Sequence, residues 1–182
     1  MGTWQTKSSK IVYDNPWIFV REDQVIFPNG KEGMYGVVES KSDAVFVIPI
    51  DSEDNVYLIQ LEHYTTRELV LQCVAGRTDG EPPVVAAKRE LPEEAGLEAK
   101  EITPLSQVRI ASGMTTFGAT ICLARGLTPN QEHIDEDEAV QTIAKFPVAT
   151  IKQMILQGDI DNTESISSLL LAFLYLESQH TT

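Results

Sequence analysis

The chain has 182 residues, of which 42% are hydrophobic and 23% charged, and this composition is typical of one globular domain with a full core. The formal net charge of −13 argues against nucleic acid and anionic membranes as partners. Residues 1–10 contain no apolar stretch like that of a secretory signal, so we expect a cytoplasmic protein. Cys73 and Cys122 are then expected to be buried free thiols, and a disulfide is the alternative.

Residues 11–40 show the alternation and the turn signals of antiparallel β structure. The sequence Pro28-Asn29-Gly30-Lys31 is a strong turn signal. We predict short strands on both sides of this turn, at 18–20, 25–27 and 35–39. The N-terminal segment is therefore expected to be rich in β structure.

The run 44–50 is almost entirely apolar, which predicts a buried central strand. A polar turn at 51–55 follows, and we expect the next strand, 56–61, to pair back on the first. Segment 69–74 predicts one further strand, which leads into a loop that contains glycine.

A helix is predicted from Pro83 to about Ala95. Proline is favoured in the first helical turn, and Gly96 fits a C-terminal cap. A small apolar face is suited to packing on a sheet and consists of Ala86, Ala87 and Leu91. Pro92 lies inside this helix, where a proline costs ~3 kcal/mol or more, so we expect it to kink or loosen the turn.

The C-terminal part of the chain is predicted to contain strands and then two helices. The strands are expected at 107–111, 119–124 and 139–146. The helices are expected at 148–157 and 163–178. The second helix carries an apolar stripe at helical spacing, which we interpret as core: Ile166, Leu169, Leu170, Phe173 and Leu176.

Three carboxylates in the first predicted helix share one face. Glu90, Glu93 and Glu94 stand at positions i, i+3 and i+4, so a helix brings them together. Like charges at this spacing repel, and a divalent cation reverses the sign of the interaction. Mg²⁺ in particular binds through one or two carboxylates together with substrate phosphates. The alternative interpretation is a solvated acidic helix end.

The spacing around these carboxylates resembles the signature of the Nudix hydrolase superfamily. That signature is a Gly, five residues, a Glu, seven residues, and then Arg-Glu-apolar-x-Glu-Glu-x-Gly-apolar. Residues 89–97 meet every specified position, and seven residues separate Glu81 from Arg89. Only four residues separate Gly76 from Glu81, so either the loop is one residue short or Ala75 occupies the glycine position.

The resemblance implies an α+β fold, an α/β/α sandwich with a mixed β-sheet, and a site for Mg²⁺ or Mn²⁺. Carried over by position, Glu90 and Glu94 are the first metal ligands. Glu93 is a third or a water-mediated ligand. Arg89 would orient the carboxylates through charge-assisted hydrogen bonds. Glu81 would support the ligands from beside the helix, and the Ala75 carbonyl is a further candidate ligand.

An acidic segment at 133–140 precedes a predicted strand, as an acidic loop does in the ADP-ribose pyrophosphatase branch of the superfamily. Matching its Glu-x-Glu onto this chain implies that Glu136 is the catalytic base and that Glu138 is a further metal ligand. The alternative is a solvated loop. His63 and His133 have no ligand spacing, so we interpret them as surface or hydrogen-bonded residues.

Other segments are similar to the ADP-ribose and ADP-sugar pyrophosphatases. They are 15–17, 60–64 and 158–162. This resemblance implies an N-terminal segment, 1–42, through which the chain forms a homodimer, and a Nudix domain over 43–182. The chain departs from that branch at 72–74, at 112–117, and in lacking an Arg near Glu62, positions that shape the substrate pocket there.

Two functions are therefore expected from the sequence. The first is metal-dependent hydrolysis of the pyrophosphate bond in a small anionic nucleotide, a nucleoside diphosphate linked to another group X such as ADP-ribose or an ADP-sugar. The alternative is a Nudix-fold nucleotide-binding or regulatory protein with impaired catalysis. The short glycine loop, Pro92 and the altered segment 72–74 favour the alternative.

Overall fold

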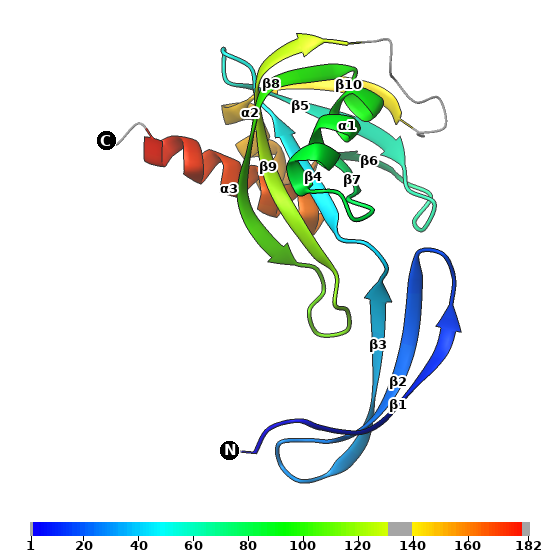
Figure 1. Cartoon of the computed structure of the whole chain (residues 1–182). Coiled ribbons are helices and arrows are strands. Elements are labelled where there is room, and N and C mark those ends of the chain that lie inside the picture. The colour runs from blue at the N-terminus through cyan, green and yellow to red at the C-terminus, as the bar shows by residue number, and fades with distance from the viewer. Residues whose placement is uncertain (1, 131–139, 180–182) are drawn as a thin grey trace.

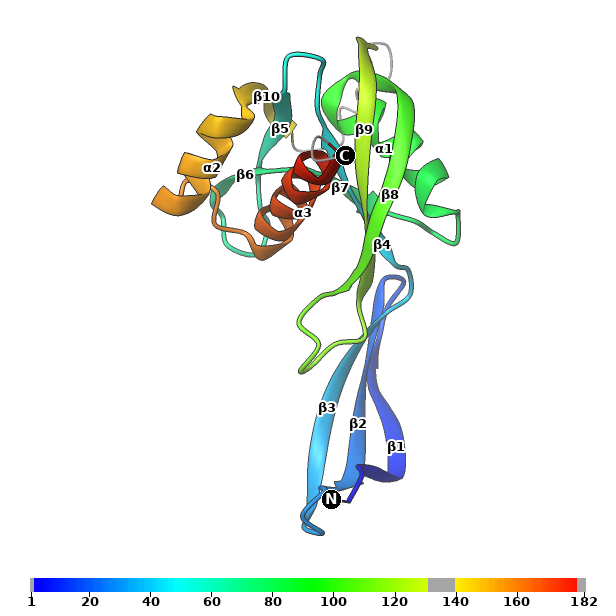
Figure 2. The ribbon, with the colours of Figure 1, turned by 90° about the vertical axis from the view of Figure 1, so that its left-hand side faces the viewer.

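The structure is a computed structural model that describes residues 2–130 and 140–179. Its N-terminal part is an antiparallel sheet of β1 (Gln5–Asp14), β2 (Ile18–Ile26) and β3 (Glu32–Ser40), in the order β1-β2-β3. This sheet projects from the body of the molecule (Figures 1 and 2). The turn between β2 and β3 is where we predicted it, with Gly30 at φ +84°.

β2 is one continuous strand, and the prediction of separate strands at 18–20 and 25–27 was wrong in this respect. Its middle residues are polar, from Arg21 to Gln24, yet they pair with β1 on one side and with β3 on the other. Pairing on both sides satisfies the backbone whatever the side chains are, so the hydrophobic pattern understates the length of the strand.

The body contains a four-stranded mixed sheet. Its order is β7-β4-β9-β8, formed by β7 (Val74–Arg77), β4 (Ala44–Pro49), β9 (Gly118–Pro129) and β8 (Leu97–Arg109). β4 runs parallel to β9 and antiparallel to β7, so the apolar run 44–50 forms an interior strand as predicted. A second sheet has the order β10-β5-β6, formed by β10 (Val140–Pro147), β5 (Asn55–Glu62) and β6 (Leu69–Gln72).

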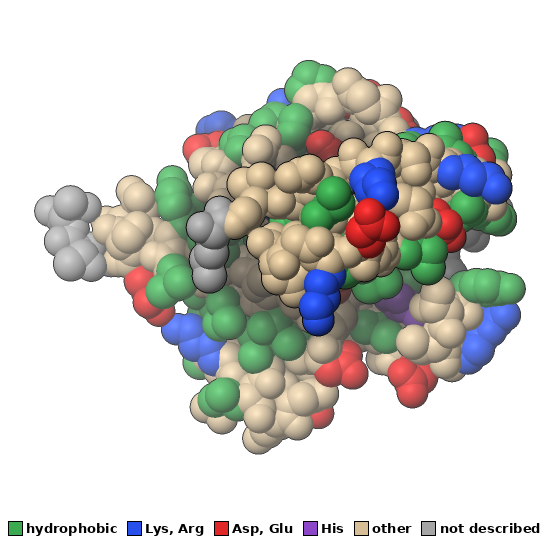
Figure 3. Space-filling view, turned by 90° about the horizontal axis from the view of Figure 1, so that it is seen from below, with side chains coloured by type: hydrophobic (Ala, Val, Ile, Leu, Met, Phe, Trp, Pro, Cys, Tyr) green, Lys and Arg blue, Asp and Glu red, His purple; other side chains and the backbone are tan. Residues whose placement is uncertain are grey.

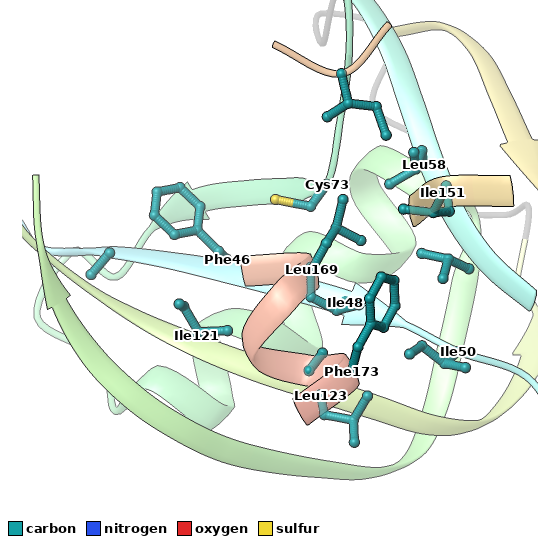
Figure 4. Packing of buried hydrophobic residues seen from close by; sticks show 14 residues of the cluster. Phe46, Ile48, Ile50, Leu58, Cys73, Ile121, Leu123, Ile151, Leu169 and Phe173 are labelled. Atoms are coloured by element: carbon teal, nitrogen blue, oxygen red, sulfur yellow. The ribbon is translucent and has the colours of Figure 1, made fainter. Parts of the chain in front are cut away.

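Helices lie on both faces of the four-stranded sheet. α1 (Pro83–Ala95) packs against the face that carries Val45 and Val47. α3 (Thr163–Gln179) packs through Leu169 and Phe173 against the opposite face, which carries Phe46 and Ile48 (Figure 4). α2 (Val148–Gln157) precedes α3 and buries Ile151 in the same core. The α/β/α sandwich with a mixed sheet is therefore confirmed.

One predicted strand pairing was wrong, and one predicted strand proved to be two. β5 does not form a hairpin with β4: only an isolated bridge joins Ile50 to Val56, and β5 pairs with β6 and β10 instead. The predicted strand 69–74 is divided at Cys73, where the chain leaves one sheet and enters the other. Both errors have one cause, because which neighbour a strand pairs with depends on long-range packing that a local pattern does not contain.

The helices match the prediction closely, and the remaining differences are small. The strand predicted at 107–111 begins at Leu97 and ends at Arg109. In the α3 stripe, Leu170 is 42% exposed and does not belong to the core, whereas Leu169 and Phe173 are buried. Cys73 and Cys122 are both buried and free, as predicted. No helix in the described residues has the length and apolar character needed to cross a membrane.

The loop between β8 and β9, residues 110–117, joins the N-terminal sheet to the body. The Val38 amide donates to the Met114 carbonyl at 2.9 Å, and the Thr116 amide donates to the Val38 carbonyl at 3.2 Å. The Thr116 hydroxyl also donates to the Glu39 carboxylate at 3.0 Å, and the Tyr35 hydroxyl donates to the Gly113 carbonyl. The loop therefore contacts the edge of β3 through an isolated parallel bridge between Val38 and Thr115 and through these side-chain hydrogen bonds.

Candidate active site

Local signals define both ends of α1. Pro83 opens the helix, and Gly96 closes it in a left-handed conformation with φ +56°. Pro92 lies inside, and the helix continues through it to Ala95. Beyond the apolar face, Glu90 and Glu94 are each only 5% exposed. These two glutamates are therefore buried between the helix and the sheet, which a solvated acidic helix end would not produce.

β7 lies at the edge of the four-stranded sheet and faces these glutamates. The Ala75 amide donates to Glu94 Oε2 at 2.8 Å. In an antiparallel pair the amide and carbonyl of one residue point the same way, so the Ala75 carbonyl faces the same edge. At Gly76 a Cβ atom would overlap the Glu90 carboxylate, so only glycine leaves room for it. Ala75 and Gly76 thus both lie against glutamates of the helix.

Arg89 connects the remaining predicted residues. Its Nη1 donates to Glu90 at 2.6 Å and to Glu93 at 3.1 Å, and its Nε donates to Glu81 at 3.2 Å. Burial alone would lower the pKa of the Arg89 guanidinium, but the hydrogen bond and charge of Glu90, with the hydrogen bonds to Glu81 and Glu93, raise the pKa above its usual value. Arg89 therefore stays charged and holds three carboxylates in place.

The shortened loop still places Glu81 beside the helix. The Glu81 amide donates to the Thr78 carbonyl at 2.8 Å, which closes a four-residue turn. The two central residues, Asp79 and Gly80, have φ +46° and +86°. Positive φ at both central positions is the signature of a type I′ turn, which reverses the chain in the fewest residues. This tight turn thus ends at Glu81, two residues before the first residue of α1.

The donor set at this edge fits a hard divalent cation. Two buried carboxylates, Glu90 and Glu94, and the Ala75 carbonyl supply oxygen atoms, and Mg²⁺ binds through few protein ligands when substrate phosphates supply the rest. Among residues 2–130 and 140–179, no three acidic, histidine or cysteine side chains gather as a ready-made metal site.

Some of the residues singled out in the sequence do not belong to this group of carboxylates in the described structure. Glu136, Glu138 and His133 lie outside the described residues. His63 forms a hydrogen bond between its Nε2 and Gln72 Oε1 at 2.7 Å, so it is a hydrogen-bonded residue as we interpreted it. Burial raises the pKa of the Cys73 thiol to about 12, so this thiol stays neutral.

Sequence reasoning missed some contacts at the site. Arg89 Nη2 also donates to the Arg77 carbonyl at 2.8 Å, a backbone contact that leaves no signal in the sequence. It also missed Asn162 and Ser165, whose side chains contact the segment that leads into β7. Asn162 stands just before a helical pattern, which is a signal for a helix N-cap but says nothing of a second contact.

Two family models match this chain. The model described as "Nucleoside diphosphate sugar hydrolase N-terminal domain" matches residues 4–38, and the model described as "NUDIX domain" matches residues 40–166. The second match covers more than half of the chain.

Similar proteins agree with these matches. The chain is 31% identical to "ADP-ribose pyrophosphatase" of Mycobacterium tuberculosis (strain ATCC 25618 / H37Rv) over 92% of this chain and 82% of that protein. It is 28% identical to "ADP compounds hydrolase NudE" of Escherichia coli (strain K12), over 84% of this chain and 82% of that protein. The solved structure titled "Crystal structure of ADP compounds hydrolase" superposes with a TM-score of 0.87 at 25% identity, covering 98% of this chain and 97% of that one. This chain belongs to the NUDIX domain family.

Proposed function

We propose that this protein hydrolyses the pyrophosphate bond of ADP-ribose or a related ADP compound. The observation that carries the proposal is the pair of buried glutamates, Glu90 and Glu94, held between α1 and the edge strand β7. As a member of the NUDIX domain family the protein is a hydrolase of nucleoside diphosphates linked to another group X. The choice of ADP compounds is supported by the names of its relatives and of the solved structure.

In this proposal each residue at the site has one role. Glu90, Glu94 and the Ala75 carbonyl would hold Mg²⁺ or Mn²⁺, and Glu93 would complete the set directly or through water. A bound cation supplies charge neutralisation on the phosphoryl oxygens and lowers the pKa of water. Arg89 fixes the orientation of the carboxylates, and Glu81 supports Arg89 from the turn.

The acidic segment supplies the base in this proposal. Water adds to one phosphorus atom, the bond to the bridging oxygen breaks, and Glu136 takes the proton from water. Glu138 is proposed as a further metal ligand. Glu136→Gln should then lower kcat with little change in metal affinity, whereas Glu138→Gln should also weaken the binding of Mn²⁺. If both variants keep full activity, the base lies elsewhere, and Glu93 or Glu81 becomes the next candidate.

A substrate panel tests the function directly. The purified protein is incubated with ADP-ribose, ADP-glucose and a dinucleoside polyphosphate, with and without Mg²⁺, and the products are separated by ion-exchange chromatography. We expect AMP and ribose 5-phosphate from ADP-ribose only when the metal is present. Binding of these nucleotides without turnover at any metal concentration would instead support the regulatory alternative.

Metal binding is also testable without substrate. Glu90 and Glu94 are buried together, so a cation that binds only the folded state should stabilise it by mass action. We expect millimolar Mg²⁺ to raise the melting temperature measured by differential scanning calorimetry. KCl at the same ionic strength, which is about three times the molar concentration of MgCl2, controls for salt screening. An unchanged melting temperature with Mg²⁺ would count against a metal site here.

We also propose that the chain forms a homodimer through its N-terminal segment, residues 1–42, while residues 43–182 form the catalytic domain. Every residue of β1 is exposed. The three-stranded sheet is seen end-on in Figure 3. Six large apolar side chains of this N-terminal segment are exposed: Trp4, Ile11, Val12, Tyr13, Trp17 and Met34. Exposed apolar side chains on one sheet support an interaction surface there.

We also propose a cytoplasmic location, which is supported by the two free thiols.

A further inference from the structure

At Cys73, where the chain passes from β6 to β7, the backbone is held by a side chain of α3. β6 pairs with β5 up to Gln72, and β7 pairs with β4 from Val74 onward. Within the described residues Cys73 belongs to neither ladder, so its amide needs another acceptor. The Ser165 hydroxyl of α3 accepts the Cys73 amide at 3.0 Å and donates to the Cys73 sulfur at 3.5 Å. Ser165 is completely buried, and only 1% of Cys73 is exposed.

A second contact from the same helix end holds the strand before the break. Asn162 stands just before α3, and its Oδ1 accepts the Ser165 amide at 2.9 Å, as a helix N-cap does. Its Nδ2 donates to the Leu71 carbonyl of β6 at 3.2 Å. The first turn of α3 therefore holds the chain at two points, at Leu71 before the break and at Cys73 in the break itself.

The strand just beyond the break, β7, is the one that contacts the glutamates. Ala75, two residues beyond Cys73, donates to Glu94, and Gly76 lies against Glu90. Because only Val74 separates Cys73 from Ala75, a displacement of Cys73 is carried along the strand to the Glu94 contact. Partners that hold a metal ligand in place matter nearly as much as the ligand itself.

We infer that Ser165 and Asn162 are positioning residues for the metal-binding carboxylates, acting through the backbone of Cys73 and Leu71. This inference rests on the proposed function. When the Ser165 hydroxyl is removed, the buried Cys73 amide loses its acceptor, and the backbone must shift to find another. That shift displaces the Ala75 amide and carbonyl relative to Glu94, so the ligand set is no longer held in one arrangement.

The test compares two buried serines of α3. Ser165→Ala removes the acceptor of the Cys73 amide. Ser168→Ala is the matched control, since Ser168 is equally buried on the same helix and its hydroxyl has no hydrogen-bond partner among the described residues. Binding of Mn²⁺ alone, without substrate, is measured by electron paramagnetic resonance of the free ion, and ADP-ribose turnover is measured in parallel.

We expect Ser165→Ala to raise the Mn²⁺ dissociation constant about tenfold and to lower kcat by a similar factor, as loss of an outer partner of a metal site does. Ser168→Ala should keep both values. Equal Mn²⁺ affinity in Ser165→Ala and wild type, or equal losses in the two variants, would overturn the inference while leaving the proposed function intact. No Mn²⁺ binding and no turnover in the wild type would overturn the proposed function itself.

Asn162→Asp provides a second variant in case Ser165→Ala fails to fold. Aspartate is as good an N-cap as asparagine, so α3 keeps its cap. The donor to the Leu71 carbonyl is replaced by a carboxylate oxygen, which repels that carbonyl. The added negative charge would by itself strengthen cation binding, so a weaker affinity for Mn²⁺ cannot come from charge. We expect the dissociation constant to rise about threefold, by the same outer-partner effect. An unchanged or lower value would contradict the inference.

Discussion

Glu94 combines two tasks in a single side chain. Its carboxylate accepts the Ala75 amide and, in our proposal, binds the metal. Glu94→Gln keeps an oxygen for the amide but removes the charge that a hard cation requires. We expect kcat for ADP-ribose to fall at least about a hundredfold with the melting temperature nearly unchanged.

The control for this variant is Glu101→Gln, which changes the same side chain on the exposed surface of β8. It should keep wild-type kcat. Near wild-type turnover of Glu94→Gln at saturating Mg²⁺ would remove Glu94 from the ligand set.

Gly76 is important at the site because it has no side chain. A Cβ atom at this position would overlap the Glu90 carboxylate, so Gly76→Ala should push Glu90 away from the edge of β7. We expect weaker Mn²⁺ binding and lower turnover. Gly36→Ala is the control, because a Cβ atom there meets no described atom within 4 Å. If Gly76→Ala binds Mn²⁺ like the wild type, the Gly76–Glu90 contact has no functional importance.

Much of the candidate site was predictable at the residue scale, because helical spacing alone places Glu90, Glu93 and Glu94 near one another and near Arg89. The burial of Glu90 and Glu94 was not predictable in the same way. It depends on β7 standing at the sheet edge beside α1, and that place is determined by pairing with β4, a strand about thirty residues earlier in the sequence.

At the scale of elements, Pro92 is the unusual feature of α1. It cannot donate to the carbonyl four residues earlier, and its ring crowds that carbonyl, yet the helix continues through it. Pro92→Ala should therefore raise the free energy of unfolding, by about 2 kcal/mol after allowing for the greater freedom of the unfolded chain. Chemical denaturation with urea measures this change. A lower free energy of unfolding would mean that Pro92 fits its surroundings better than alanine does.

The elements themselves were predicted well where the signals are local and poorly where they are not. α1 begins and ends at the predicted residues because Pro83 and Gly96 act within one turn. We predicted that 56–61 pairs with 44–50, and this was wrong. A polar turn such as 51–55 can join two strands of a hairpin or lead the chain from one sheet to another. In this chain Asp51 accepts the amides of Glu53 and Asn55, which forms the turn without specifying the neighbour of the next strand.

At the scale of the whole molecule, the N-terminal segment carries several exposed large apolar side chains, among them Trp4, Tyr13 and Trp17. Trp17 is 59% exposed on it, and buried tryptophans often dominate the energy of an interface. If the sheet forms the dimer interface, Trp17→Glu should raise the dimer dissociation constant about a hundredfold or more. Sedimentation equilibrium over a range of concentrations measures this constant.

Leu156→Glu is the matched control for the dimer, because Leu156 is 79% exposed but lies on α2, outside the N-terminal sheet. It should leave the association unchanged. A wild-type protein that sediments as a monomer at all concentrations would contradict the dimer, and a dimer that Leu156→Glu weakens but Trp17→Glu does not would move the interface to α2.

The contact between Glu94 and β7 also bears on how an inactive form of the protein should be made. An edge strand with unsatisfied amides is a template for pairing with another chain, and Glu94 covers the Ala75 amide on this edge. Glu94→Ala would remove the acceptor along with the charge and leave the Ala75 amide without this partner, so its loss of activity would mix two causes. A catalytically silent protein intended for binding studies or crystallisation with substrate should therefore carry glutamine at this position.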